Sequence, residues 1–195
     1  MRISACYIVK DEAEELRRSL ASVRAAVDEI IVVSTAGSPA VRDVCDLFSA
    51  EVHDFAWAND FSLARNKVLQ YVTGNIVIFL DADEYFLHPN HLRKVIEDIV
   101  QNSPDFDIIM LRRYSFITNE SMIDAQQDHS PRILRMPGMH YEGMIHEQPV
   151  RDDGKERVVA YADERLSVGH TGYTKERGPE KIKRNIAMLE EDAAR

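Results

Sequence analysis

Cysteines and long apolar runs are both scarce in this sequence of 195 residues. Its 2 cysteines, Cys6 and Cys45, are too few for the disulfide framework of a small secreted protein, and we expect both to be buried, unpaired side chains. No apolar run approaches the roughly 20 residues of a membrane-spanning helix, and charges at Arg2 and Lys10 interrupt the first segment too early for a signal-peptide core. These shortages predict a cytoplasmic protein without an integral membrane segment, either free or peripheral at the inner membrane face.

Positive charge is also in short supply. The 24 lysines and arginines are outnumbered by 33 aspartates and glutamates, which gives a formal net charge of −9. Because no long run of either sign occurs, nucleic acid is not an expected partner and no polybasic membrane patch is predicted. Hydrophobic residues make up 45% of the chain, which is enough for the core of one domain of this length.

The most informative stretch that is present reads IVIFLDADE, from residue 76 to residue 84. Its apolar run predicts a strand buried on both faces, and the acids follow at the carboxyl end, where open α/β sheets bind ligands. Alternation along an extended chain puts Asp81 and Asp83 on one side, with the small Ala82 between them. Two neighbouring carboxylates repel unless a cation lies between them, so the pattern predicts Mg²⁺ or Mn²⁺ and substrate phosphates. A solvated acidic turn is the alternative interpretation.

Strands and helices alternate through the first half of the chain. Apolar, β-branched runs predict buried strands at residues 3–9, 29–33 and 76–80, with a short strand near 51–55. Asp11 is the expected N-cap of the first helix. Apolar stripes at helical spacing are expected over residues 13–23, 40–48, 61–72 and 92–100. This order predicts an α/β fold, a mostly parallel sheet with helices on both faces.

The pattern changes after residue 103. The later segments look like strands separated by loops, so we predict a nucleotide-binding half over residues 1–103 and a smaller mixed, partly antiparallel half over 104–178. A C-terminal helix is expected over 179–195, and its apolar stripe raises the expectation that the natural chain continues beyond Arg195. The expected strands of the second half are 108–116, 132–136, 145–150 and 158–162, and the helix stripe is Ile182, Ile186, Leu189 and Ala193.

Several short elements, taken in order, carry a resemblance to a known family. They are IVKDE at 8–12, VDEIIVV at 27–33, DFSLARN at 60–66, FLDADE at 79–84, YEGMIHEQ at 141–148, HTGYT at 170–174 and KRN at 183–185. With them the sequence resembles the family 2 glycosyltransferases of the GT-A (Rossmann-like) fold. It is most similar to the subgroup often followed by tetratricopeptide repeats, which includes bacterial sugar transferases acting on lipopolysaccharide cores and on peptides. The resemblance covers nearly the whole chain and makes residues 1–178 a single GT-A domain.

This resemblance implies a nucleotide-sugar site. Val9 and Lys10 would lie beside the base, Arg65 near the nucleotide, Asp81 on the ribose or a metal-bound water, and Asp83 on the metal. A uridine diphosphate sugar is the default donor, and Mn²⁺ or Mg²⁺ the expected cofactor. Without the resemblance, Arg65 would be interpreted as an exposed helix charge. The implied nucleotide-sugar residues are Val9, Lys10, Ser34, Arg65, Asp81, Ala82 and Asp83, and the implied metal ligands are Asp83, Asp81 and His170.

One position departs from the family pattern. Relatives usually carry an aspartate at the position of Ser34, where it hydrogen-bonds the base, and the following loop reads STAGSP here. A serine can still hydrogen-bond a base edge, although a neutral partner is weaker than a charged one. The identity of the donor base is therefore the feature most affected by this substitution.

Inverting transfer of a sugar needs a base that takes the acceptor proton and a positive charge that neutralises the departing diphosphate. Glu147, at the end of what looks like a strand, is the predicted base, although a surface His-Glu pair is the plainer interpretation. His170 would add a metal ligand or a diphosphate contact, whereas a lone histidine is more often structural. Trp57 is expected to be a core anchor. Candidates for diphosphate or acceptor contacts, or else solvated charges, are Arg132, Arg135, Lys183 and Arg184.

Other functions fit the sequence less well. A sugar-1-phosphate nucleotidyltransferase carries a glycine-rich loop after its first strand, and residues 9–13 contain no glycine. A haloacid-dehalogenase phosphatase needs its Asp-x-Asp after the first strand, whereas here it follows the fourth. A non-catalytic binding module, with Ser34 marking a lost donor site, stays open, and the presence of Asp83 and Glu147 argues against it. The acceptor, whether a glycan, a lipid-linked molecule or a peptide, is not identified by the sequence.

Overall fold

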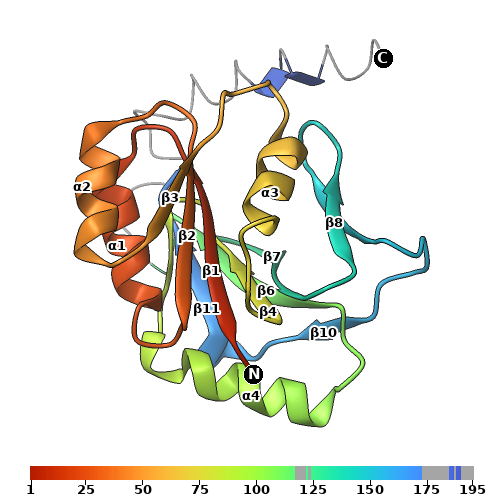
Figure 1. Ribbon diagram of the computed structural model, residues 1–195. Helices are drawn as coiled ribbons and strands as arrows, with labels where there is room; N and C mark the ends of the chain where they lie inside the picture. The colour runs from red at the N-terminus through yellow and green to blue at the C-terminus, as the bar shows by residue number, and fades with distance from the viewer. Residues whose placement is uncertain (117–121, 123, 173–184, 187, 190–195) are drawn as a thin grey trace.

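A nine-stranded sheet organises the computed structural model, which describes residues 1–116, 122, 124–172, 185, 186, 188 and 189 (Figure 1). Its strands are β1 (Ile3–Val9), β2 (Glu29–Ser34), β3 (Glu51–Asp54), β4 (Ile76–Phe79), β5 (Glu84–Phe86), β6 (Ile108–Ser115), β7 (Gln126–Arg135), β10 (Val159–Tyr161) and β11 (Ser167–His170). The order is β3-β2-β1-β4-β7-β6-β11-β5, with β10 paired to β6. The strands from β3 to β4 are parallel, whereas β7 runs antiparallel to both of its neighbours.

Helices cover both faces of this sheet, and on one face a small hairpin packs beside a helix. The helices are α1 (Ala13–Val23), α2 (Pro39–Leu47), α3 (Phe61–Leu69) and α4 (Leu92–Asn102), and the hairpin pairs β8 (Met139–Glu142) with β9 (Gln148–Arg151). Helices α1, α2 and α4 contribute to one hydrophobic core, whereas α3 and β8 contribute to the other. The predicted α/β fold, with a mostly parallel first half and a mixed second half, is confirmed (Figure 1).

The two cores explain why the central strands are apolar at every position. In β4, Ile76 and Ile78 face the core of α1, α2 and α4, whereas Val77 and Phe79 face the core of α3 and β8. Both faces of the strand are therefore withdrawn from water, as expected for a central parallel strand. Cys6 and Cys45 are buried and unpaired, as predicted.

Several predicted helix and strand boundaries were wrong, and these lie in segments rich in polar residues. Glu12, not Asp11, precedes α1, and it makes no side-chain cap, because its carboxylate accepts the amide hydrogens of Lys10 and Asp11 instead. The first half of the strand predicted at 145–150 is a loop, since β9 starts at Gln148, and β7 begins at Gln126 rather than near 132. The short strands β5, β8 and β11 were not predicted, because three or four residues with polar side chains give too weak a pattern.

The described part of the C-terminal segment packs through a different face from the one predicted. Met188 is buried against Met144 and Ile145, with Trp57 and Phe61 alongside, so Trp57 anchors a small core cluster as expected. In contrast, Ile186 and Leu189 from the predicted stripe are 51% and 44% exposed. The other predicted stripe residues, Ile182 and Ala193, lie outside the described residues. None of the helices in the described ranges is long and apolar enough to cross a membrane.

Candidate active site

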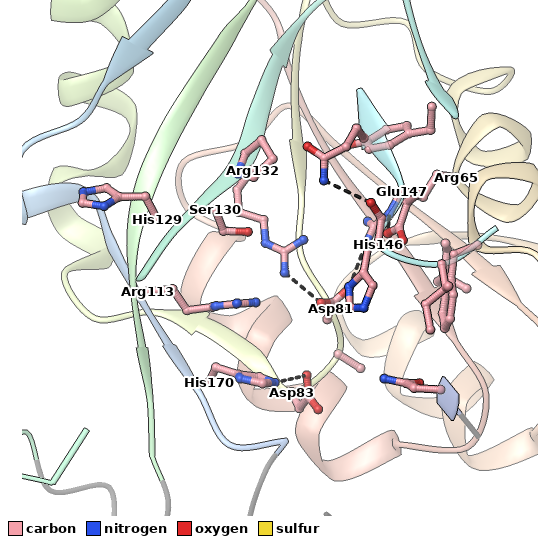
Figure 2. A pocket seen from close by; sticks show the side chains of 18 of the residues that line it. Arg65, Asp81, Asp83, Arg113, His129, Ser130, Arg132, His146, Glu147 and His170 are labelled. Carbon is pink, nitrogen blue, oxygen red and sulfur yellow. Dashed lines mark hydrogen bonds and ion pairs between the residues drawn. The ribbon is translucent and has the colours of Figure 1, made fainter. Parts of the chain in front are cut away.

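A cavity of about 400 Å³ opens where β4 ends, between α3 and the second half of the chain (Figure 2). The turn after β4 contributes Asp81 and Asp83, and α3 contributes Arg65. The loop between β8 and β9 contributes residues 145–148, and the end of β11 contributes His170. The cavity therefore collects side chains from segments that are far apart in the sequence.

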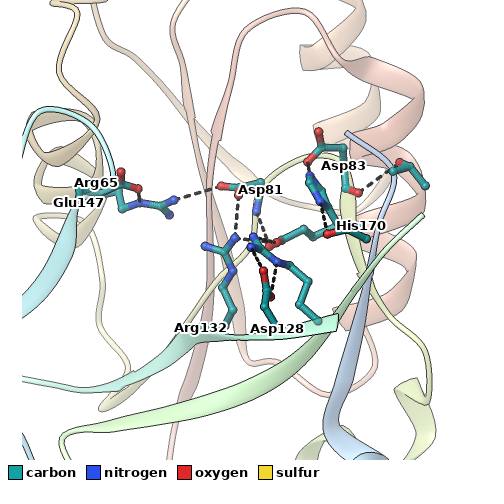
Figure 3. Close-up of polar contacts among 11 residues, drawn as sticks. Arg65, Asp81, Asp83, Asp128, Arg132, Glu147 and His170 are labelled. Atoms are coloured by element: carbon teal, nitrogen blue, oxygen red, sulfur yellow. Dashed lines mark hydrogen bonds and ion pairs between the residues drawn. The ribbon is translucent and has the colours of Figure 1, made fainter. Parts of the chain in front are cut away.

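Arg65 joins two of the predicted site residues. Its Nε lies 2.5 Å from Oε1 of Glu147, and its Nη2 lies 3.1 Å from Oδ1 of Asp81 (Figure 3). The Arg65 side chain is only 6% exposed. Burial alone would lower the pKa of this guanidinium, but the negative charges of Glu147 and Asp81 raise it above its usual value. The interpretation of Arg65 as an exposed charge was wrong, because Arg65 is buried and lines the cavity; its expected place near a nucleotide stays a prediction.

A second guanidinium holds Asp81 from the other side. Arg132 on β7 lies 2.8 Å from Oδ2 of Asp81 and 2.6 Å from Oε1 of the fully buried Glu84. Desolvation would raise the pKa of Asp81, but Arg132 and Arg65 hold it well below its usual range. Asp81 is therefore a fixed anion, and its carboxylate is engaged by two arginines.

Asp83 and His170 form the other polar pair of the cavity. Nε2 of His170 lies 3.6 Å from Oδ1 of Asp83, and Nδ1 lies 3.1 Å from Oγ of Ser115 (Figure 3). The amide and the hydroxyl of Thr171 both donate to the carbonyl of Asp83, which ties the end of β11 to the turn between β4 and β5. His170 can donate an Nδ1 proton to Ser115, and in that tautomer Nε2 offers a lone pair to a cation held beside Asp83.

This pair suits a divalent cation that is completed by a substrate. One carboxylate oxygen and one imidazole nitrogen are ligands that Mn²⁺ accepts, and Mg²⁺ also binds through one or two carboxylates plus phosphates. Within the described ranges no group of three or more His, Cys, Asp or Glu side chains is placed to hold a metal alone. The predicted metal ligands Asp83 and His170 thus lie together, whereas Asp81 is bound to arginines instead.

Three of the predicted donor residues do not reach this cavity. Val9 points into the core of α1 and α2, and its carbonyl accepts the amide hydrogen of Thr35. Lys10 is exposed, and the hydroxyl of Ser34 accepts the amide hydrogen of Gly37, closing its own loop. From β1 it is Ile8 that lines the cavity, as alternation along the strand could have indicated.

Other cavity residues were not assigned a role by the sequence. Arg113 pairs with Asp128 at 2.7 Å and reaches Glu84 at 3.4 Å, so it supports the buried acid that Arg132 also binds. No sequence motif marks Arg113, because it lies within a strand whose charged face is recognised only when β6 and β7 pair. Arg135 lies over the ring of Phe106 rather than in the cavity. Lys183 and Arg184 lie outside the described residues.

Comparison with known proteins gives the same family as the motifs. Residues 4–166 match the family described as Glycosyl transferase family 2. The SPbeta prophage-derived glycosyltransferase SunS of Bacillus subtilis (strain 168) is 27% identical over 194 residues, which cover 97% of this chain and 44% of that protein. The TPR repeat-containing protein Synpcc7942_0270 of Synechococcus elongatus is 43% identical over 83 residues, which cover 43% of this chain and 21% of that protein.

A solved structure similar to this chain is glucosyl-3-phosphoglycerate synthase from Mycobacterium tuberculosis in complex with Mn²⁺, uridine diphosphate and glucosyl-3-phosphoglycerate. Its TM-score is 0.47 at 18% sequence identity, covering 61% of this chain and 44% of that chain. The chain spans less than half the length of these curated relatives. Since the family match extends over most of the sequence, the chain belongs to glycosyl transferase family 2.

Proposed function

We propose that this chain is the catalytic domain of an inverting glycosyltransferase that uses a nucleoside diphosphate sugar, with uridine diphosphate as the default carrier. The observation that carries the proposal is the single cavity shared by Asp83, His170 and Glu147, with Arg65 linking Glu147 to Asp81. A diphosphate at one end and a base at the other are what inverting transfer requires. The acceptor is expected to be a glycan, a lipid-linked molecule or a peptide, and the setting cytoplasmic.

Asp83 and His170 would hold Mn²⁺ or Mg²⁺ at the diphosphate end. When bound, the ion would offset the negative charge that develops on the departing diphosphate. Arg132 supports this end of the cavity from β7, where its guanidinium keeps Asp81 ionised and fixed. Asp81 is thereby suited to accept a hydrogen bond from a ribose hydroxyl or a bound water, and unsuited to take a proton.

Glu147 is the proposed base at the opposite end. Its Oε1 is held by Nε of Arg65, which fixes the orientation of the carboxylate, and its side chain is only 12% exposed. Oε2 has no hydrogen-bond partner among the described residues, so it is placed to accept the proton of an attacking group. A base of this kind must be rigid and within reach of the reacting hydroxyl, which the bond to Arg65 favours.

The test is calorimetric titration of uridine diphosphate into the protein, with and without Mn²⁺. We expect binding that requires Mn²⁺ and that Asp83→Ala weakens at least about tenfold, because a carboxylate ligand of the ion is lost. The matched control is Asp98→Ala, a partly exposed acid on α4 that pairs with Lys94 at 2.8 Å and does not line the cavity. No binding to the wild type under either condition would contradict the proposal and favour a non-catalytic binding module.

A further inference from the structure

His146, the residue before Glu147, adopts a backbone conformation that its side chain disfavours. Its φ angle is 57°, in the left-handed region where glycine is the usual residue. The same loop also contains Gly143, at φ 96°, so the chain uses glycine at one such position and histidine at the other. Ser49 and Asn59 have similar φ angles of 54° and 53°, and of these three residues it is His146 that lines the cavity.

The imidazole of His146 makes no contact that would stabilise the described part of the fold. His146 is exposed, and within the described part of the chain its ring makes no hydrogen bond or ion pair. The backbone carbonyl of His146 accepts a hydrogen bond from Nε2 of Gln148 at 3.1 Å. A cavity-lining imidazole without a hydrogen-bond partner among the described residues is available to bind a ligand.

The position of the ring indicates which part of a ligand it would meet. His146 lines the cavity, and Figure 2 shows its imidazole projecting from the loop toward the side where Asp81 lies. Under the proposed function the diphosphate occupies the end at Asp83 and His170, and the attacking group occupies the end at Glu147. The sugar to be transferred must lie between these ends, because its anomeric carbon is where the bond to the diphosphate breaks and the bond to the acceptor forms.

We propose that His146 binds the sugar of the donor, by hydrogen bonding a hydroxyl group through its imidazole. The inference rests on the proposed function and adds a residue that distinguishes a nucleotide sugar from the bare nucleotide. An imidazole can donate from one nitrogen and accept at the other, which suits a hydroxyl that does both. The left-handed backbone at residue 146 turns the ring into the cavity while Glu147 stays bonded to Arg65.

The experiment measures the affinity of uridine diphosphate and of three sugar nucleotides, UDP-glucose, UDP-galactose and UDP-N-acetylglucosamine, in the presence of Mn²⁺. For the sugar nucleotide that the wild type binds best, His146→Gly should lower the affinity about three- to tenfold, the effect of one lost hydrogen bond, and leave the affinity for uridine diphosphate unchanged. Because glycine relieves the backbone strain, the melting temperature should not fall. His146→Asn, which tolerates the left-handed region and can hydrogen bond, should restore part of the sugar affinity.

Ser49→Gly is the matched control. Ser49 is exposed in the turn after α2, has a φ angle of 54° and does not line the cavity, so its replacement relieves similar strain without touching the site. If His146→Gly bound the sugar nucleotide and uridine diphosphate with the same relative affinities as the wild type, this inference would be wrong, whereas the proposed function would stand. An equal loss of affinity for both ligands would mean that His146 contacts the nucleotide, and a lower melting temperature would mean that it supports folding. Either result would also overturn the inference. A wild type that binds no uridine diphosphate would overturn the proposed function, and this inference with it.

Discussion

Arg65 shows how one side chain can set the chemistry of a cavity. Its two contacts come from different parts of the chain, Asp81 in the turn after β4 and Glu147 in the loop before β9. Each carboxylate is thereby held in one orientation beside the other. The rings of Phe79 and Tyr141 lie 5.1 and 5.3 Å from the guanidinium carbon, so its faces are covered by aromatic side chains. Such a group loses less on burial than an ammonium would.

The first prediction concerns Glu147. We expect Glu147→Gln to slow the hydrolysis of UDP-glucose, in which water replaces the acceptor, by at least about 100-fold, because an amide cannot take the proton. The affinity for uridine diphosphate with Mn²⁺ should be unchanged, since Glu147 lies at the other end of the cavity from Asp83. The measurement is the release of glucose together with calorimetric titration of both proteins.

Glu142→Gln is the control for this prediction, because Glu142 is an exposed acid on the same hairpin and pairs with His140 at 3.1 Å. It should hydrolyse UDP-glucose at the wild-type rate. If Glu147→Gln also kept that rate, the proton would be taken by another group, and the assignment of the base would be wrong while the donor site remained.

At the scale of elements, α3 is fixed to β8 by one asparagine. Nδ2 of Asn66 donates to the carbonyl of Tyr141, and the amide of Tyr141 donates to Oδ1 of Asn66, both at 2.8 Å. The side-chain amide therefore binds the backbone of β8 much as a neighbouring strand would. Arg65 directly precedes Asn66, and the loop that carries Glu147 directly follows β8. The hydrogen bonds of Asn66 therefore hold Arg65 and Glu147 close enough to pair.

The second prediction is that Asn66→Ala lowers the free energy of unfolding by about 2 kcal/mol. Two hydrogen bonds are lost, and the backbone groups of Tyr141 are left without these partners in a half-buried place. Urea unfolding measures the change. Asn102→Ala is the control, because Asn102 donates to the carbonyl of Asp98 on the exposed end of α4 and should cost no more than about 0.5 kcal/mol. Equal losses in the two variants would show that the hydrogen bonds of Asn66 contribute nothing.

The sequence predicted those elements whose apolar pattern is long enough to be decisive. The strands β1, β2 and β4 and the helix α4 were placed within a few residues, because continuous apolar runs and helical stripes follow directly from burial. It failed for the loop at residues 143–147, where apolar Met144 and Ile145 pack into a small cluster rather than a strand. Their burial depends on Trp57 and Phe61, which lie far away in the sequence.

Site residues follow the same rule. Asp81 and Asp83 follow β4 and line the cavity, as a strand end in the sequence could indicate, whereas the roles predicted for them stay predictions. Arg65 could not be placed from its helix alone, because the acids that bury it are 16 and 82 residues away. The expected contacts of Val9, Lys10 and Ser34 with a nucleotide remain predictions, since none of these side chains lines the cavity with Asp81.

At the scale of the whole molecule, Glu29 joins three segments at the amino ends of the central parallel strands, whereas the cavity opens at the carboxyl end of β4. Its carboxylate accepts hydrogen bonds from Oγ of Ser4 at 2.6 Å and from the amides of Thr73 and Gly74 at 2.8 and 3.2 Å. Gly74 is needed there, because a Cβ atom would lie 2.3 Å from Oγ of Ser4. Partial burial would raise the pKa of Glu29, but the hydrogen bonds lower it to about 2.

The last prediction follows from this pKa. A carboxyl whose pKa falls from 4.5 in the unfolded chain to about 2 in the folded one stabilises the fold fully above pH 4.5, and the contribution is lost as the pH falls toward 2. The size of the shift corresponds to about 3 kcal/mol. Glu29→Gln should therefore lower the free energy of unfolding by about 2–3 kcal/mol at pH 7, and the difference from wild type should shrink between pH 4.5 and pH 2.5.

Urea unfolding of both proteins at several pH values across this range measures that difference. Glu14→Gln is the control, because the Glu14 side chain is 85% exposed and should show no such dependence. A difference that stays constant as the pH falls would mean that Glu29 acts through packing rather than through its charge. The contacts of Glu29 with Ser4, Thr73 and Gly74 would then stabilise the fold to the same extent with the carboxyl charged or neutral.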